Sequence, residues 1–199
     1  MGNRRMGRKR IQAINKLAEN MSAISGSKPG PGFQCADVRR RREGHKIITE
    51  VAIDLGCTGS HIASSTTDND IIGAVGIDGA YICQLNAETS GYITYVEMAC
   101  LEAPADAEPD IDLVMIHAHA SGAMDDAHTD MESTSLIASN ADWTLGRVDH
   151  YAVGHGTTLD LGSEGAYLYL ANGVNADPGT YSAGKFVITI EGYRVNDDQ

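Results

Sequence analysis

A pair of histidines separated by one residue, His117 and His119, is the first place in this sequence where side chains could do chemistry. On a β-strand, residues two apart project from the same face, so both imidazoles could bind one metal ion. Further ligands are available in the residues that follow: Asp125, Asp126, His128 and Asp130. The pattern gives one hypothesis, a metal-dependent enzyme that acts through His117 and His119.

The residues around the histidine pair argue against that hypothesis. In jelly-roll metalloenzymes of the cupin kind, the His-x-His pair is preceded by a glycine and closely followed by a glutamate. Here Ile111 stands at the position expected for the glycine, and A-S-G-A-M-D-D follows His119. His155 is a distant third ligand without the surrounding pattern. We therefore expect solvent-facing histidines, no catalytic or metal-binding residues, no cofactor, and a protein that is not an enzyme.

Two acidic segments, residues 104–112 and 125–132, contain clustered carboxylates. Such clusters on loops suit calcium, a hard cation that prefers oxygen ligands. Neither segment has the spacing of the helix-loop-helix calcium motif. We favour the simpler interpretation, solvated loops that keep a crowded assembly soluble.

Charge is divided unevenly along the chain. Residues 1–46 contain 12 basic and three acidic groups, a net charge of +9, whereas residues 47–199 contain three basic and 24 acidic groups, a net charge of −21. This division predicts a basic arm that binds an acidic partner, attached to a strongly acidic body.

The basic segment also has an apolar stripe. Apolar residues recur at helical spacing within residues 4–22, which predicts a short amphipathic helix, and S-G-S-K-P-G-P-G at 25–32 reads as a linker. We predict an arm and linker over residues 1–43. Its binding residues are expected to be Arg4, Arg5, Arg8, Lys9, Arg10, Ile11, Ile14, Leu17, Arg39, Arg40, Arg41 and Arg42.

The arm has two candidate partners. DNA phosphates would give salt-sensitive, sequence-independent binding, and the chain would then be a nucleic-acid-binding protein. An acidic protein surface, including the body of a neighbouring copy, is the partner that we favour. The apolar stripe serves no purpose in phosphate contacts but helps docking to protein, and the planar guanidinium pairs well with carboxylates.

The rest of the chain, residues 44–199, is predicted to be all-β. In residues 44–56, one face carries Ile47, Thr49, Val51, Ile53 and Leu55 and the other carries Glu50 and Asp54, which is typical of a strand buried on one side. Turn residues separate the candidate strands, and their number predicts a jelly-roll-like β-sandwich. The candidate strands are 47–55, 80–86, 92–102, 111–119, 134–138, 150–153, 157–161, 166–171 and 185–194.

The cysteines and the apolar runs indicate the compartment. Cys35, Cys57, Cys83 and Cys100 are scattered, and we expect them to be reduced and buried. The N-terminus has no secretory signal pattern, and no apolar run is long enough to span a bilayer. We therefore expect a soluble protein that is made in a host cytoplasm and does not bind membranes.

Three segments carry a resemblance to a known family: M-G-N-R-R-M-G-R-K-R at the start, I-I-T-E-V-A-I-D-L-G in the first predicted strand, and T-Y-S-A-G-K-F-V-I-T-I-E-G-Y near the end. They resemble small virion structural proteins of marine tailed phages, especially cyanophages. The resemblance implies a β-sandwich body, a location in the virion, and a capsid or other virion protein as partner. We accordingly expect a capsid decoration or capsid-associated protein, present as a homo-oligomer, with a trimer as the first expectation.

Overall fold

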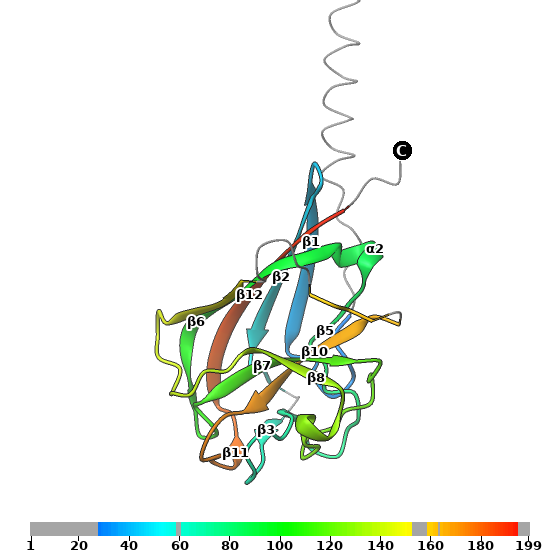
Figure 1. Ribbon diagram of the computed structural model, residues 1–199. Helices are drawn as coiled ribbons and strands as arrows, with labels where there is room; N and C mark the ends of the chain where they lie inside the picture. The colour runs from blue at the N-terminus through cyan, green and yellow to red at the C-terminus, as the bar shows by residue number, and fades with distance from the viewer. Residues whose placement is uncertain (1–27, 59–60, 153–158, 163, 195–199) are drawn as a thin grey trace, which may run out of the picture.

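The computed structural model describes residues 28–58, 61–152, 159–162 and 164–194, and these are almost entirely strands joined by loops (Figure 1). The elements are β1 (Ala36–Glu43), β2 (Lys46–Asp54), β3 (Ile62–Ser64), β4 (Gly73–Ala74), β5 (Cys83–Leu85), α2 (Ala87–Ser90), β6 (Tyr92–Ala105), β7 (Ile111–His117), η1 (His128–Asp130), β8 (Ser133–Ile137), β9 (Val148–Ala152), β10 (Ala166–Asn172), β11 (Gly179–Thr180) and β12 (Ala183–Tyr193).

The strands form two main antiparallel sheets. The larger sheet has the order β1-β2-β12-β6-β9 and the second sheet has the order β5-β10-β7-β8, while β11-β3-β4 form a small third sheet. Without β1 and the small third sheet, eight strands remain: β2, β5, β6, β7, β8, β9, β10 and β12. If these are numbered 1 to 8 in chain order, the larger sheet has the order 1-8-3-6 and the second sheet has the order 2-7-4-5. Two interleaved Greek keys produce this arrangement, so the body is a jelly roll. The predicted all-β, jelly-roll-like sandwich is confirmed.

The core lies between the facing sides of the two sheets. Alternate residues of β2 and β12, such as Val51 and Ile188, are fully buried and pack against the inner side of the second sheet. Trp143 closes one side of this core: its ring meets that of Phe186 edge to face at 5.5 Å, and its Nε1 donates to the Ile111 carbonyl at 2.7 Å. Alternation along the strands therefore gives each sheet one apolar face, and the two apolar faces pack against each other.

The outer faces of the two sheets differ. The outer face of the second sheet is covered by loops, which bury Ile71 and Ala80 against Tyr169 of β10. On the outer face of the larger sheet, by contrast, Leu101 of β6 is 56% exposed and Val148 of β9 is 49% exposed. Among the described residues, this face of the sandwich is the open one.

Most of the predicted strands are present. They correspond to β2, β5, β6, β7, β8, β9, β10 and β12. The predicted strand 157–161 lies partly outside the described residues, and its described part is not a strand. Strand β1 and the short strands β3, β4 and β11 were not predicted from the sequence.

Strand β1 corrects the predicted boundary between arm and body. Residues 1–43 were predicted as arm and linker, but β1 pairs with β2 along its whole length, from Ala36 opposite Ile53 to Glu43 opposite Lys46. A tight turn joins the two strands, with Gly44 in the left-handed region at a φ of 64°. The body therefore begins before residue 44, and the segment predicted as its first strand is its second.

The described end of the predicted linker is also part of the body. The Gly30 amide donates to the Tyr81 carbonyl at 2.8 Å, and the Gly32 amide donates to the Gly79 carbonyl at 3.1 Å. A Cβ on Gly30 would lie 1.9 Å from the Gly79 oxygen, so only glycine allows this close approach. The chain thus joins the body at a fixed place.

The prediction of four reduced cysteines is wrong for two of them. Cys35, just before β1, and Cys57, just after β2, form a disulfide with their Cα atoms 5.9 Å apart. Antiparallel pairing of β1 with β2 brings the two flanking segments together, and the spacing in the sequence does not reveal this. Cys83 and Cys100 are free and buried, as predicted. Burial raises the pKa of the Cys83 thiol to about 12.

Candidate functional site

The structure describes only some of the residues that were predicted to bind a partner through the arm. Arg4, Arg5, Arg8, Lys9, Arg10, Ile11, Ile14 and Leu17 lie outside the described residues, so their role stays a prediction. Residues 1–27 contain six basic groups and one acidic group, a net charge of +5, and residues 28–199 contain nine basic and 26 acidic groups, a net charge of −17. The N-terminal segment is therefore still basic and the body still acidic when residues 28–46 are counted with the body.

The four arginines from Arg39 to Arg42 belong to β1, not to the arm, which corrects the prediction. Strand alternation sends Arg39 and Arg41 to the outer face, where Arg39 pairs with Asp37 at 2.7 Å and Arg41 pairs with Glu50 at 2.6 Å. Exposed pairs of this kind contribute roughly 0–1 kcal/mol each. Because β1 is an edge strand, its charges also hinder pairing with the edge of another sheet.

Arg40 points the other way and is only 3% exposed. Its Nη2 donates to the Gln84 carbonyl of β5 at 2.5 Å, and its Nε donates to Thr49 Oγ1 at 3.3 Å. Burial lowers the pKa of Arg40, although a guanidinium stays protonated in proteins. Arg40 therefore joins the two sheets and is not available to a partner.

The outer face of the larger sheet has an apolar row across four strands. Strand register places side by side the residues Ala52 of β2, Val187 of β12, Ala99 of β6 and Val148 of β9. Leu101 lies two residues beyond Ala99 on the same face of β6. We call these five residues the apolar row.

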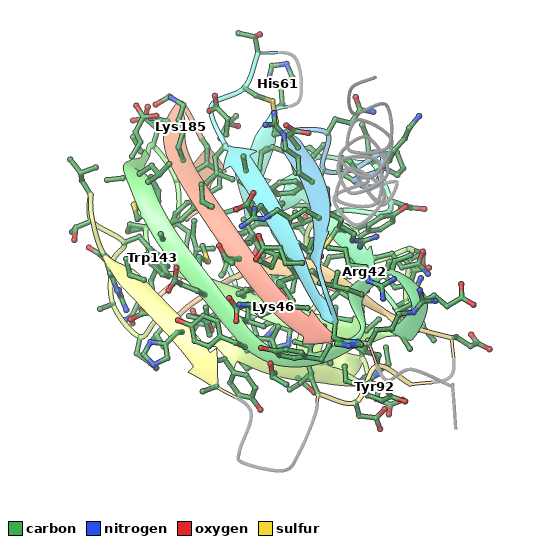
Figure 2. All side chains as sticks on the ribbon, turned by 90° about the horizontal axis from the view of Figure 1, so that it is seen from above. Arg42, Lys46, His61, Tyr92, Trp143 and Lys185 are labelled. Atoms are coloured by element: carbon green, nitrogen blue, oxygen red, sulfur yellow. A yellow bond between two sulfur atoms is a disulfide. The ribbon has the colours of Figure 1, made fainter. Side chains whose placement is uncertain are left out.

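Acidic residues border the apolar row on both sides. On one side, Glu50 of β2 and Glu97 of β6 lie two residues from Ala52 and Ala99. On the other side, Asp54 lies two residues beyond Ala52, and an irregularity in β6 places Glu102, three residues beyond Ala99, opposite Lys185. Glu102 pairs with Lys185 at 2.5 Å. Figure 2 looks onto this sheet and labels Lys185, near the start of β12, and Lys46, the first residue of the neighbouring strand β2.

A groove opens at the β1–β2–β12 end of the apolar row, with a volume of about 460 Å³. Its lining includes Ala52, Leu101 and Val187 of the row, together with the charged residues Asp37, Asp54 and Lys185. An apolar surface with acidic borders can receive an amphipathic segment that is apolar on one face and basic elsewhere. Sequence reasoning missed this surface, because it depends on which residues the register places side by side.

The histidine pair does not have the predicted geometry. Strand β7 ends at His117, and Ala118 adopts a left-handed conformation with a φ of 52°. The two imidazoles are therefore not on one face of a strand; His117 is half-buried, whereas His119 is exposed and its carbonyl accepts from the Tyr169 hydroxyl at 2.6 Å. Within residues 28–58, 61–152, 159–162 and 164–194, no three His, Cys, Asp or Glu side chains form a group that could hold a metal ion.

The acidic loop 104–112 is not simply solvated, which corrects that interpretation. Glu108 is 1% exposed, and its two carboxylate oxygens accept from the Asp110 amide at 2.7 Å and the Asp177 amide at 2.6 Å. Asp110 is 4% exposed and accepts from the Val174 amide at 3.2 Å. Burial raises the pKa of Glu108. These carboxylates bind the loop before β11, whereas Asp125 in the other acidic loop is exposed, as expected.

Comparison with solved structures gives a weak likeness to a capsid chain. The chain is similar to a chain of the cyanophage Pam1 capsid asymmetric unit, with 14% sequence identity and a TM-score of 0.37 over 86% of this chain and 93% of that chain. No protein-family model and no curated protein sequence matches it. In the described part of the chain, no helix is both long and apolar enough to cross a bilayer.

Proposed function

We propose that this protein is a structural component of a phage virion, a capsid decoration or capsid-associated protein that its basic N-terminal arm attaches to the particle. The observation that carries the proposal is the combination of a jelly-roll body with a basic segment of opposite charge that enters the body at a fixed place. The resemblance of three segments to virion proteins of marine tailed phages supports it. Jelly rolls also occur among lectins and cupins, so the fold alone does not select this function.

The described titratable residues favour a binding role over a catalytic one. The most buried carboxylates, Glu108 and Asp110, accept hydrogen bonds from backbone amides of the body, and Arg40 joins the two sheets. What remains open is a broad sheet face with an apolar row. A surface of this kind suits contact with another macromolecule.

The proposal includes several copies of the chain in each particle. Exposed ion pairs are individually weak, so one arm gains little from its charges alone. A homo-oligomer, with a trimer as the first expectation, would present several arms at once and multiply their effect.

The test is to purify particles of the phage that encodes this protein and to measure its copy number by quantitative mass spectrometry. A virion component should remain at a constant ratio to the major capsid protein through successive density gradients. Loss of the protein to the soluble fraction would contradict the proposal. An image reconstruction of particles with and without the protein would then show its position.

The alternative of a metal-dependent enzyme is tested on the same full-length protein. The double variant His117→Ala with His119→Ala should incorporate into particles as the unmodified chain does, because neither histidine lies on the apolar row. Elemental analysis should find no zinc, iron or manganese near one ion per chain. Tightly bound metal that the double variant lacks would favour the enzyme.

A further inference from the structure

We propose that the arm of one copy docks along the apolar row of a neighbouring copy, with Ile11, Ile14, Leu17 and Met21 facing Ala52, Val187, Ala99, Val148 and Leu101. This inference rests on the proposed function, because it names the acidic protein surface to which the arm binds. It makes the open face of the larger sheet an interface between copies.

The lengths of the two apolar features agree. The row from Ala52 to Val148 crosses four adjacent strands, and three spacings of about 4.8 Å give roughly 14 Å. The stripe from Ile11 to Met21 covers ten residues, which a helix with a rise of 1.5 Å per residue would extend over about 15 Å. A helix laid across the strands would therefore contact the row along its length.

The exposure of the row is suited to such docking. Leu101 is 56% exposed and Val148 is 49% exposed, and the groove beside Ala52 gives room for a branched side chain. The small side chains of Ala52 and Ala99 let a helix approach the sheet closely. Amphipathic helices bind apolar grooves through residues at this spacing.

The charges of the arm and of the surface are opposite in sign. On a helix, Arg10 lies along the apolar stripe, four residues before Ile14, whereas Arg8, Lys9 and Lys16 lie on the face that carries Gln12. On the body, carboxylates border the row on both sides at Glu50, Glu97, Asp54 and Glu102. Glu50 and Glu102 already pair with Arg41 and Lys185, so the charge argument rests on the net charges, +5 for residues 1–27 and −17 for residues 28–199. This difference favours the contact over one with an uncharged apolar surface.

The route of the chain favours a neighbouring copy over the same copy. Gly30 is bound to Tyr81, whose ring meets that of Tyr167 at 4.9 Å on the outer face of the second sheet. From there the chain passes to the larger sheet, where Cys35 precedes β1. The apolar row lies on the opposite outer face, so the arm would have to return around the edge that residues 30–35 already cross.

The experiment uses full-length protein in solution, without particles. Ile14 is replaced by the photo-crosslinker p-benzoylphenylalanine in unlabelled protein, which is mixed with an excess of nitrogen-15-labelled protein and irradiated. Mass spectrometry then identifies the joined peptides. We expect unlabelled arm peptides joined to labelled peptides that contain Ala52, Ala99, Leu101 or Val187. The same probe at Gln12, which a helix would place on the opposite face, should give few such products.

Matched variants of the labelled protein test the surface. Leu101→Asp should reduce the cross-link about tenfold or more, as expected for a lost apolar anchor. Val174→Asp should not, because Val174 is similarly exposed, at 54%, and lies in the loop between β10 and β11, outside the larger sheet. Ala52→Glu, at an exposed position in the groove, provides a second disruption if Leu101→Asp does not fold.

Three results would overturn the inference: products within the unlabelled copies alone, products on another surface, or equal losses for Leu101→Asp and Val174→Asp. Each would leave the proposed function standing if the protein is found in purified particles. Absence from particles, with the cross-link intact, would instead overturn the proposed function alone.

Discussion

The Nη2 of Arg40 donates a hydrogen bond to the Gln84 carbonyl at 2.5 Å and so connects an edge strand of the larger sheet to an edge strand of the second. An arginine from the most basic run of the sequence is thus a structural element at one side of the sandwich. Its neighbours in the run, Arg39 and Arg41, remain on the surface.

Replacing Arg40 should therefore destabilise the body, whereas replacing Arg39 should not. Arg40→Ala leaves the Gln84 carbonyl without this charged donor and opens space between the sheets, which should cost about 2–4 kcal/mol. Arg39→Ala removes an exposed ion pair and should cost less than about 0.5 kcal/mol. Urea unfolding of the two variants, analysed with a common slope, measures both values. Equal losses would show that Arg40 does not join the sheets.

The disulfide between Cys35 and Cys57 should stabilise the body by constraining the unfolded chain. For a sequence separation of 22 residues, the expected contribution is about 3 kcal/mol. The double variant Cys35→Ser with Cys57→Ser should lose this amount in urea unfolding. Reductant should destabilise the unmodified protein by a similar amount and leave the double variant unchanged. An effect of reductant on both proteins would point to another thiol.

Asp112 should make the body more stable at mildly acidic pH. Burial raises the pKa of this carboxyl to about 6, against the opposing effect of the hydrogen bond that it accepts from the Ser139 amide at 2.7 Å. A raised pKa favours the protonated, folded form, so the contribution is complete below the pKa of the unfolded chain and is lost as the pH rises through about 6. The slope should not exceed about 1.4 kcal/mol per pH unit.

The variant Asp112→Asn isolates this effect, because an amide oxygen can still accept from Ser139. The difference in unfolding free energy between the unmodified protein and the variant should shift in favour of the unmodified protein as the pH falls from 7 to 5. A difference that stays constant between these pH values would contradict the raised pKa.

Apolar residues of the arm should contribute more to incorporation into particles than single basic residues do. Burying Ile14 is worth about 1.5–3 kcal/mol, whereas one exposed ion pair of Arg10 is worth about 0–1 kcal/mol. Ile14→Asp should therefore reduce incorporation into particles more than Arg10→Ala, at low and at high salt. If only the charge variants matter and the full chain binds DNA with a steep salt dependence, the arm contacts nucleic acid.

The jelly roll was predictable from the sequence because its strands are long enough to show alternation. β2 presents β-branched residues at every second position, β12 presents Phe186, Ile188 and Ile190 in the same way, and turn residues separate the strands. The short strands β3, β4 and β11 have two or three residues each, too few for a period to appear. They are defined by pairing with distant segments.

Strand β1 was missed for a different reason. A run of four arginines has no apolar alternation, and yet Arg40 is buried and Arg41 is not. The long side chain of arginine reaches a carbonyl of the other sheet, which composition does not indicate. The apolar row and the disulfide likewise depend on register between strands, so no local pattern could have shown them.

The disulfide next to β1 also determines how the body would bear tension. A pull on the arm would enter at Gly30 and reach Cys35 before it reaches β1. The disulfide to Cys57 would then transmit the force to the C-terminal end of β2, which pairs with β1 on one side and with β12 on the other. The force would therefore not separate β1 from the edge of the sheet. An arm joined in this way would detach from its partner before the body unfolds, and the jelly roll would stay folded.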